Sequence, residues 1–374
     1  MRILMTTDTI GGVWSYALEL AAALGDDEVV LATMGPRPSH AQRAAAAELP
    51  NLSLTSGAWR LEWMQGAWPD VERAGDWLLD IADRTAPDLV HLNGYVHASL
   101  PWPAPVLVAA HSCVLSWWQA VRGERAPREW TRYGEAVLEG LQAADCVVAP
   151  TAAFLETLQR LYGPLPAARV IPNGRRASRC APAPKAPFVF SAGRLWDEAK
   201  NMAVLDAAAH DLPWPVIVAG DSCTPDGGDV LYERLTRLGV LAPPELARRL
   251  QRASIYASPA LYEPFGLAAL EAGQAGCALV LGDIPTLREV WADAAVYVPP
   301  RDPEALRAAL ARLIGDPALR ARYADRALRR ARRCTPARMA AEYRATYCAM
   351  LAAAARRAAP ADAHRTARIA EAQA

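Results

Sequence analysis

Two glutamates stand out as groups able to do chemistry, because they flank the string Glu-Pro-Phe-Gly-Leu-Ala-Ala-Leu-Glu that runs from Glu263 to Glu271. A helix starting near Gly266 would direct the free backbone N–H groups of Phe265, Gly266 and Leu267 at a ligand, which favours phosphate. Eight helical steps would separate the carboxylates by about 12 Å at 1.5 Å per residue, too far for an acid and a nucleophile acting across one bond. The string therefore predicts two contacts on one long ligand. An ordinary helix with a capping glutamate is the alternative.

A pair of cations follows another predicted strand. Arg194 comes directly after Ser-Ala-Gly, and Lys200 comes six residues later at an expected helix start. Two cations near one strand end can clamp a diphosphate and stabilise its negative charge while the bond to it breaks. Asp197 and Glu198 lie between them and are expected to position the cations or to change which ligand is accepted. The alternative is that both cations lie on the surface.

Two further motifs sit where α/β sheets bind ligands. Gly11 and Gly12 lie between the first predicted strand and the first helix, where the chain can approach a phosphate or a sugar hydroxyl closely. His111 follows an apolar strand, at the carboxyl edge of the predicted sheet, and could contact a substrate hydroxyl or move a proton. A tight turn and a capped core histidine are the alternatives. Neither a dinucleotide fingerprint nor a P-loop is present.

Short apolar strands that alternate with helical patterns must position these residues, and such alternation is typical of a parallel sheet covered on both faces. The proline-rich stretch 171–187 predicts a linker between two such units, and the length of 374 residues fits two domains. We expect an N-terminal domain at 1–174, completed by a C-terminal helix at about 340–374, and a second domain at 175–339. The expected strands are 2–5, 29–33, 52–54, 88–92, 106–110, 146–149, 188–191, 215–219, 255–257, 278–282 and 295–298. The expected helices are 13–24, 71–85, 130–143, 151–162, 202–209, 231–238, 267–276, 304–313, 318–333 and a long pattern after 338.

The composition narrows the function classes. Lys plus Arg and Asp plus Glu both number 40, so no overall charge favours nucleic acid as a partner. Seven widely spaced cysteines without a C-x-x-C predict free thiols in a cytoplasmic protein, with no zinc site. No apolar stretch is long enough to span a membrane. An arginine cluster in the tail is most simply a solvated helix face, and it leaves open a peripheral contact with the inner face of the membrane; its members are Arg356, Arg357, Arg365 and Arg368.

Taken together, the four motifs resemble those of the retaining glycosyltransferases of family 4, which have the GT-B architecture. The resemblance covers most of the chain and is most specific at Glu263–Glu271. It extends to Gly193-Arg194, to Ile-Pro-Asn-Gly at 171–174 and to Gly-Asp-Ile-Pro at 282–285. It implies two Rossmann-like domains facing each other across a deep cleft. The acceptor would enter from the N-terminal domain, and the nucleotide-sugar donor would lie mainly on the C-terminal one.

The resemblance also implies roles for individual residues. Arg194 and Lys200 would bind the donor diphosphate, Glu263 and His111 would contact the donor sugar, and Glu271 would hold the ribose hydroxyls. The remaining donor-binding residues that it implies are Gly11, Gly12, Asn173, Phe265, Gly266 and Leu267. Pro264 replaces a glycine that is frequent in the family. Thr9 stands where starch and glycogen synthases carry a lysine, which argues against that branch.

The expected function is retaining transfer of a hexose from a nucleotide-diphosphate sugar, with UDP-glucose the best guess, to a glycan, lipid-linked or small-molecule hydroxyl. No metal and no other cofactor is expected, because the two cations would take a metal's role. A sugar-nucleotide 2-epimerase or a phosphorylase on the same fold is the first alternative. A catalytically silent nucleotide-sugar-binding protein is the second. The oligomeric state is left open.

Overall fold

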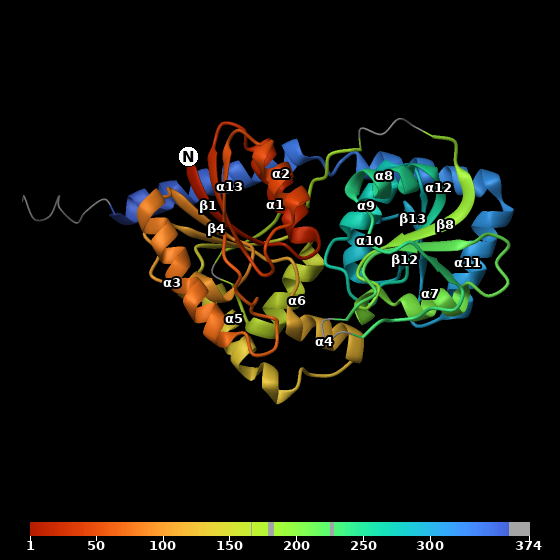
Figure 1. Ribbon diagram of the computed structural model, residues 1–374, viewed down its shortest axis with the longest axis horizontal. Coiled ribbons are helices and arrows are strands. Elements are labelled where there is room, and N and C mark those ends of the chain that lie inside the picture. The colour runs from red at the N-terminus through yellow and green to blue at the C-terminus, as the bar shows by residue number, and fades with distance from the viewer. Residues whose placement is uncertain (166, 179–182, 225–227, 359–374) are drawn as a thin grey trace, which may run out of the picture.

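The computed structural model describes residues 1–165, 167–178, 183–224 and 228–358. Two α/β units lie side by side, and each has its own sheet (Figure 1). We call the first unit, β1 to β7 with the returning helix α13, the N-terminal half. The second unit, β8 to α12, is the C-terminal half. The fold is therefore the expected α/β arrangement with two parallel sheets.

The N-terminal half is built on a seven-stranded parallel sheet in the order β3-β2-β1-β4-β5-β6-β7. Every residue of β4, β5 and β6 is buried, as expected of strands covered on both faces. Its elements are β1 (Arg2–Asp8), α1 (Gly12–Ala23), β2 (Glu28–Met34), α2 (His40–Ala47), β3 (Leu52–Ser56), α3 (Trp68–Thr85), β4 (Leu89–Leu92), η1 (Val96–Ser99), β5 (Val106–Ala109), α4 (Val114–Arg122), η2 (Arg128–Trp130), α5 (Thr131–Ala143), β6 (Cys146–Ala149), α6 (Ala152–Tyr162) and β7 (Ala168–Val170).

The C-terminal half repeats the plan with a six-stranded parallel sheet in the order β10-β9-β8-β11-β12-β13. The chain order reverses direction beside β8, which is where open α/β sheets bind ligands at their carboxyl edge. Its elements are β8 (Ala186–Ala192), η3 (Glu198–Lys200), α7 (Met202–Ala208), β9 (Val216–Ala219), β10 (Leu235–Arg237), α8 (Pro243–Arg252), β11 (Ala253–Ser258), α9 (Leu267–Gln274), β12 (Ala278–Gly282), α10 (Pro285–Trp291), β13 (Ala295–Val298), α11 (Pro303–Gly315) and α12 (Pro317–Ala331).

One predicted helix is wrong. The segment 231–238 has leucines at helical spacing, yet it contains the short edge strand β10, which pairs in parallel with β9. Leu231 is 71% exposed, so the apparent apolar face is not a buried face. Pairing with the edge of the sheet outweighs the local helical pattern here. The helices α2, α4, α8 and α10 were not predicted.

The last helix, α13 (Pro336–Ala358), returns from the C-terminal half and packs on α1 of the N-terminal half (Figure 1). Met339, Tyr343 and Tyr347 are buried in the N-terminal core. Arg357 of this helix donates to Asp145 at 2.7 Å. Arg365 and Arg368 of the tail cluster lie outside the described residues.

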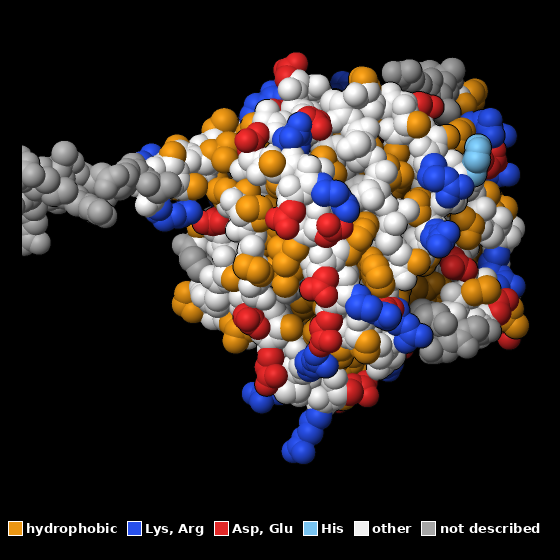
Figure 2. All heavy atoms as spheres, turned by 60° about the vertical axis from the view of Figure 1, so that its left-hand side comes forward, with side chains coloured by type: hydrophobic (Ala, Val, Ile, Leu, Met, Phe, Trp, Pro, Cys, Tyr) orange, Lys and Arg blue, Asp and Glu red, His pale blue; other side chains and the backbone are white. Residues whose placement is uncertain are grey.

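The surface carries both signs of charge. On the face shown in Figure 2, basic and acidic side chains are interspersed, with apolar side chains between them. Among the described residues, no helix is both long and apolar enough to cross a membrane. The six cysteines that the structure describes are free thiols.

Candidate functional site at the junction of the two halves

The junction between the halves brings together motifs that lie far apart in the sequence. A Cβ placed on Gly11 would lie 3.3 Å from Nη1 of Arg194, and one on Gly12 would lie 3.1 Å from Cδ1 of Leu267. Gly11 also has a φ of +76°, a conformation that L side chains rarely adopt. The glycine turn of the N-terminal half therefore faces both the cation segment and the start of α9.

Arg194 is held by the acidic string that follows it. Its Nη2 donates to Oδ2 of Asp197 at 2.6 Å, and the Arg194 guanidinium lies 5.5 Å from the Trp196 ring. Asp197 also accepts from the backbone N–H of Ala199 and from Nε1 of Trp117 on α4, across the junction. Burial acts to raise the pKa of Asp197, but Arg194 and Lys200 hold it below its ordinary value. Asp197 therefore positions the cation, as the sequence suggested.

Lys200 is the second cation, at the end of η3. Its Nζ donates to Oε2 of Glu263 at 2.6 Å, and both side chains are about four-fifths buried, at 19% and 20% exposure. Glu263 is fixed further because Thr286 donates to its backbone oxygen at 2.7 Å. A predicted cation and a predicted carboxylate, 63 residues apart in the chain, thus meet at the junction.

Glu271 has a different partner from Glu263. Arg175 donates from Nε to its Oε1 at 2.7 Å. Burial raises the pKa of Glu271, and Arg175 counteracts this only in part. Helix α9 begins at Leu267, so only the second half of the Glu263–Glu271 span is helical, and the estimate of about 12 Å for eight helical steps does not apply as calculated. The two glutamates are held by separate cations, Glu263 by Lys200 and Glu271 by Arg175.

His111 is held in one tautomer by Asn93. Asn93 follows β4, and its Nδ2 donates to the backbone oxygen of Thr6 at 2.7 Å, which leaves Oδ1 as the acceptor. Nε2 of His111 lies 2.7 Å from that oxygen and must donate to it. Nδ1 is then an acceptor. Burial lowers the pKa of His111 to about 4, so the ring is neutral at about pH 7.

A buried aromatic group packs behind His111. The Tyr16 ring meets it edge-on, at 4.5 Å between ring centroids. His91 lies deeper, where its Nδ1 is 2.6 Å from the hydroxyl of Tyr347 on α13. Burial and the neighbouring His111 lower the pKa of His91 to about 3. Helix α13 is thus linked to His111 through the rings of His91 and Tyr16.

Two carboxyl groups of the N-terminal half were not predicted. Asp8 ends β1 and accepts from the backbone of Ile10, and Glu62 accepts from the backbone N–H groups of Tyr95 and Val96. Burial raises the pKa of Asp8 to about 6, against the opposing effect of the Ile10 N–H and of Arg194. Burial raises the pKa of Glu62 to about 7. The position of Asp8 at a strand end is the sequence signal that could have identified it, and the same signal applies to Asn93, whereas Glu62 lies in the stretch between β3 and α3 and carries no such signal.

The remaining predicted residues are placed as follows. Phe265 is 3% exposed and belongs to the core of the C-terminal half. Gly266 caps α9 with a φ of +92°. Asn173 is 6% exposed, where the chain crosses between the halves. Thr9 donates to the backbone oxygen of Pro36 at 2.7 Å.

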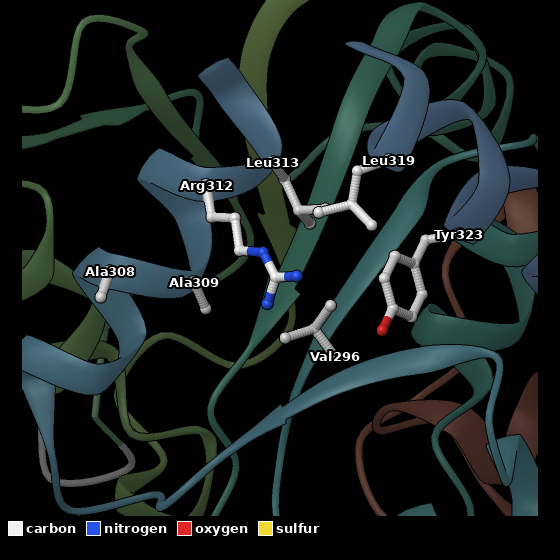
Figure 3. A pocket seen from close by; sticks show the side chains of 7 residues that line it. All are labelled: Val296, Ala308, Ala309, Arg312, Leu313, Leu319 and Tyr323. Atoms are coloured by element: carbon white, nitrogen blue, oxygen red, sulfur yellow. The ribbon is translucent and has the colours of Figure 1, made fainter. Parts of the chain in front are cut away.

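Two cavities lie away from the junction. One of about 220 Å³ lies between α11, α12 and β13, where Arg312, Val296 and Tyr323 point toward one another (Figure 3). The other, of about 330 Å³, lies between α3 and α5 and is lined by Trp68 and His97 among others. Neither contains a residue of the predicted site. No group of three His, Cys, Asp or Glu side chains suited to a metal occurs within the described part of the chain.

Family comparisons agree with the division into halves. The model for "Glycosyltransferase Family 4" matches residues 10–179, and the model for "Glycosyl transferases group 1" matches residues 179–330. The two matches adjoin in the stretch that links β7 to β8. Between them they include every predicted site residue.

Individual relatives lie in the same group of enzymes. A glycogen synthase of Mycobacterium tuberculosis is 29% identical over 377 residues, covering 88% of this chain and 90% of the relative. A phosphatidyl-myo-inositol mannosyltransferase of Mycolicibacterium smegmatis is 34% identical over 182 residues, covering 44% and 47%. The first of these similarities runs against the expectation, based on Thr9, of a chain outside the glycogen synthase branch.

Solved structures share the fold at lower identity. Sucrose-phosphate synthase from Thermosynechococcus elongatus superposes with a TM-score of 0.79 at 19% identity, covering 94% of this chain and all of that one. Anabaena HepE, solved in complex with UDP-glucose, gives a TM-score of 0.74 at 18% identity, covering 93% and 100%.

Proposed function

The chain belongs to the family 4 glycosyltransferases with the GT-B fold, and from that premise we propose that it moves glucose from UDP-glucose to a hydroxyl acceptor with retention of configuration and without a metal. The N-terminal half, at 1–174 with the returning helix, would receive the acceptor. The C-terminal half, at 175–339, would bind the donor. The acceptor would be a glycan, a lipid-linked sugar or a small molecule.

One observation carries the proposal: the two predicted cations converge on the glycine turn and on Glu263 at the junction. Arg194 lies against Gly11, and Lys200 lies 2.6 Å from Glu263. An ammonium has three N–H donors, so Lys200 can hold Glu263 and still donate to a phosphate oxygen. Fixed positive charge beside the leaving diphosphate is what a metal supplies in other transferases. UDP-glucose as donor is supported by the fold shared with HepE, which was solved with that molecule.

The reaction that we propose uses these positions in the following way. The bond between the sugar C1 and the diphosphate oxygen breaks, and the charge that develops on the leaving group is stabilised by Arg194 and Lys200. The acceptor oxygen bonds to C1 from the same face, and its proton passes to the leaving phosphate. Nδ1 of His111 accepts a hydroxyl hydrogen of the donor sugar. Glu263 accepts a second one, and Glu271 accepts from the ribose.

A nucleotide panel followed by turnover tests the proposal. Thermal shifts are measured with UDP, GDP and ADP, and the largest stabilisation is expected with UDP, because a ligand of the folded state alone raises stability by mass action. Donor turnover is then measured with excess chelator and is expected to persist. A preference for GDP or ADP would overturn the choice of donor, and complete loss of turnover with chelator would overturn the metal-free reaction.

The product distinguishes the remaining alternatives. Retention predicts that the transferred sugar keeps the anomeric configuration of the donor, which NMR of the product reads directly. An epimerised free sugar or nucleotide, formed without any acceptor, would instead identify a 2-epimerase. Binding of UDP-glucose with no turnover under any acceptor condition would indicate a silent binding protein.

A further inference from the structure

Arg175 occupies the point where the chain crosses between the two halves. Its backbone N–H donates to the oxygen of Cys334, on the segment that returns to the N-terminal half, at 3.1 Å. Its own backbone oxygen accepts from Nε2 of Gln274 on α9 at 2.7 Å. The preceding Gly174 packs so tightly on Thr335 that a Cβ there would lie 2.3 Å from a backbone oxygen. The backbone of Arg175 is therefore held by the returning segment at Cys334 and by α9.

The guanidinium of Arg175 joins a helix from each half. Its Nε donates to Glu271 on α9 at 2.7 Å, and its Nη1 donates to Oε1 of Glu19 on α1 at 3.4 Å. The three side chains are only 22%, 23% and 14% exposed for Arg175, Glu271 and Glu19. Oε2 of Glu19 is buried and accepts no hydrogen bond from the described residues. Among the described residues, Arg175 is thus the ion-pair partner of the Glu19 carboxylate.

We propose that Arg175 is a positioning residue for nucleotide binding, which orients Glu271 toward the ribose hydroxyls and ties this contact to α1 of the N-terminal half through Glu19. The inference rests on the proposed function, in which Glu271 contacts the ribose. Glu19 and Glu271 repel each other, and the Arg175 guanidinium, which contacts both, offsets this repulsion at Glu271. An ionised carboxylate accepts hydroxyl hydrogen bonds more strongly than a protonated one.

The electrostatic surroundings of Glu271 give a second consequence. Glu19 faces it from α1, Arg175 from the crossing, and Tyr256 from β11. Burial raises the pKa of Glu271 and Arg175 lowers it, so removing Arg175 raises this pKa further. As the pH is lowered, UDP binding that needs the ionised Glu271 carboxylate is then lost at a higher pH in a variant without Arg175 than in the unchanged protein.

The test compares ribose discrimination before and after Arg175→Gln. Affinities for UDP, 2′-deoxy-UDP and 3′-deoxy-UDP are measured by calorimetry on the full chain. The unchanged protein is expected to bind at least one deoxy nucleotide about tenfold more weakly, as for loss of a hydrogen bond to a charged group. In Arg175→Gln, the affinity for UDP should fall by about tenfold, and the difference in affinity between UDP and the deoxy nucleotides should largely vanish. Arg176→Gln, which removes the same charge from an exposed neighbour, should retain both.

The outcomes separate this inference from the proposed function. An unchanged protein that binds UDP without discriminating the deoxy nucleotides would overturn the ribose role of Glu271 and the inference with it. Normal discrimination in Arg175→Gln would overturn the inference alone. An equal loss of affinity for all three nucleotides would show that Arg175 has only a structural role and would also overturn the inference. Arg175→Lys keeps the charge but not the branched guanidinium. It is a second test in case Arg175→Gln fails to fold, and it should retain part of the discrimination between UDP and the deoxy nucleotides.

Glu19→Gln tests the connection to the N-terminal half. This change keeps the pair of Arg175 with Glu271, so ribose discrimination should persist. Hydrolysis of UDP-glucose should slow by about two- to fivefold, as expected for loss of one partly buried ion pair. A rate equal to that of the unchanged protein would overturn the proposed link through Glu19.

Discussion

The C-terminal half brings charged side chains to the junction as ion pairs, whereas the N-terminal half also brings groups, such as His111 and Glu62, whose charged form burial disfavours. On the first side, Arg194 pairs with Asp197 and Lys200 pairs with Glu263. On the second side, burial lowers the pKa of His111 to about 4 and raises the pKa of Glu62 to about 7. Desolvation of Asp197 is outweighed by its cation partners, whereas among the described residues no ion pair opposes the desolvation of His111 or Glu62.

This difference corresponds to the two kinds of chemical group in a nucleotide sugar. A diphosphate calls for fixed positive charge, which the C-terminal half can keep in place because each cation has a carboxylate partner. Sugar hydroxyls call for neutral donors and acceptors of defined direction, such as the His111 ring fixed by Asn93. Under the proposed function, the His111 ring would therefore suit the sugar, and the cations of the C-terminal half would suit the diphosphate.

The largest effect is expected from removing charge on the C-terminal side. Lys200→Met should lower kcat for donor turnover by about 100- to 1000-fold, because the charge that develops on the leaving diphosphate loses one of its cations. Steady-state kinetics with UDP-glucose measure this. Lys200→Arg should recover part of the rate, and Arg84→Gln, on the exposed face of α3, should leave it unchanged. A rate within about twofold of the original would show that Lys200 does not serve the reaction.

An intermediate effect is expected from adding charge on the N-terminal side. Asn93→Asp places a carboxylate against Nε2 of His111 and should raise the pKa of that ring by about one to three units. Below its new pKa the ring is protonated at both nitrogens and cannot accept a sugar hydroxyl. The acid limb of the kcat profile should therefore move to higher pH, with little change in affinity for UDP. An unmoved acid limb would separate His111 from the reaction.

The smallest effect is expected on stability. Folded Glu62 keeps its proton up to about pH 7, whereas the unfolded chain ionises near the ordinary pKa of 4.5. The folded state thus holds the extra proton between these values, so the free energy of unfolding is highest below this window and falls as pH rises through it. Glu62→Gln should flatten this fall by on the order of 1 kcal/mol. Denaturant titrations at several pH values measure it, with exposed Glu139→Gln as control.

The sequence by itself determined the local features. Alternation of apolar strands and helices gave both parallel sheets, because strands buried on both faces must be apolar throughout. The motifs also marked Arg194 and Lys200 as a pair of cations able to clamp a diphosphate, and the resemblance to the family added Glu263 as a contact of the donor sugar. Asp197 was expected either to position the cations or to change which ligand is accepted, and its contact with Arg194 fits the first of these.

Only the tertiary structure decided which residues stand opposite one another. Arg175 comes from a stretch without regular structure, and nothing in its neighbourhood in the chain indicates contact with both Glu19 and Glu271. The neutral state of His111 depends on burial, and the nitrogen that carries its hydrogen depends on Asn93, which follows a different strand. The edge strand β10 forms where the local pattern predicts a helix, because it pairs with β9, a strand from a separate part of the chain. Pairing across the junction and desolvation are properties of the packed molecule, so local sequence patterns do not encode them.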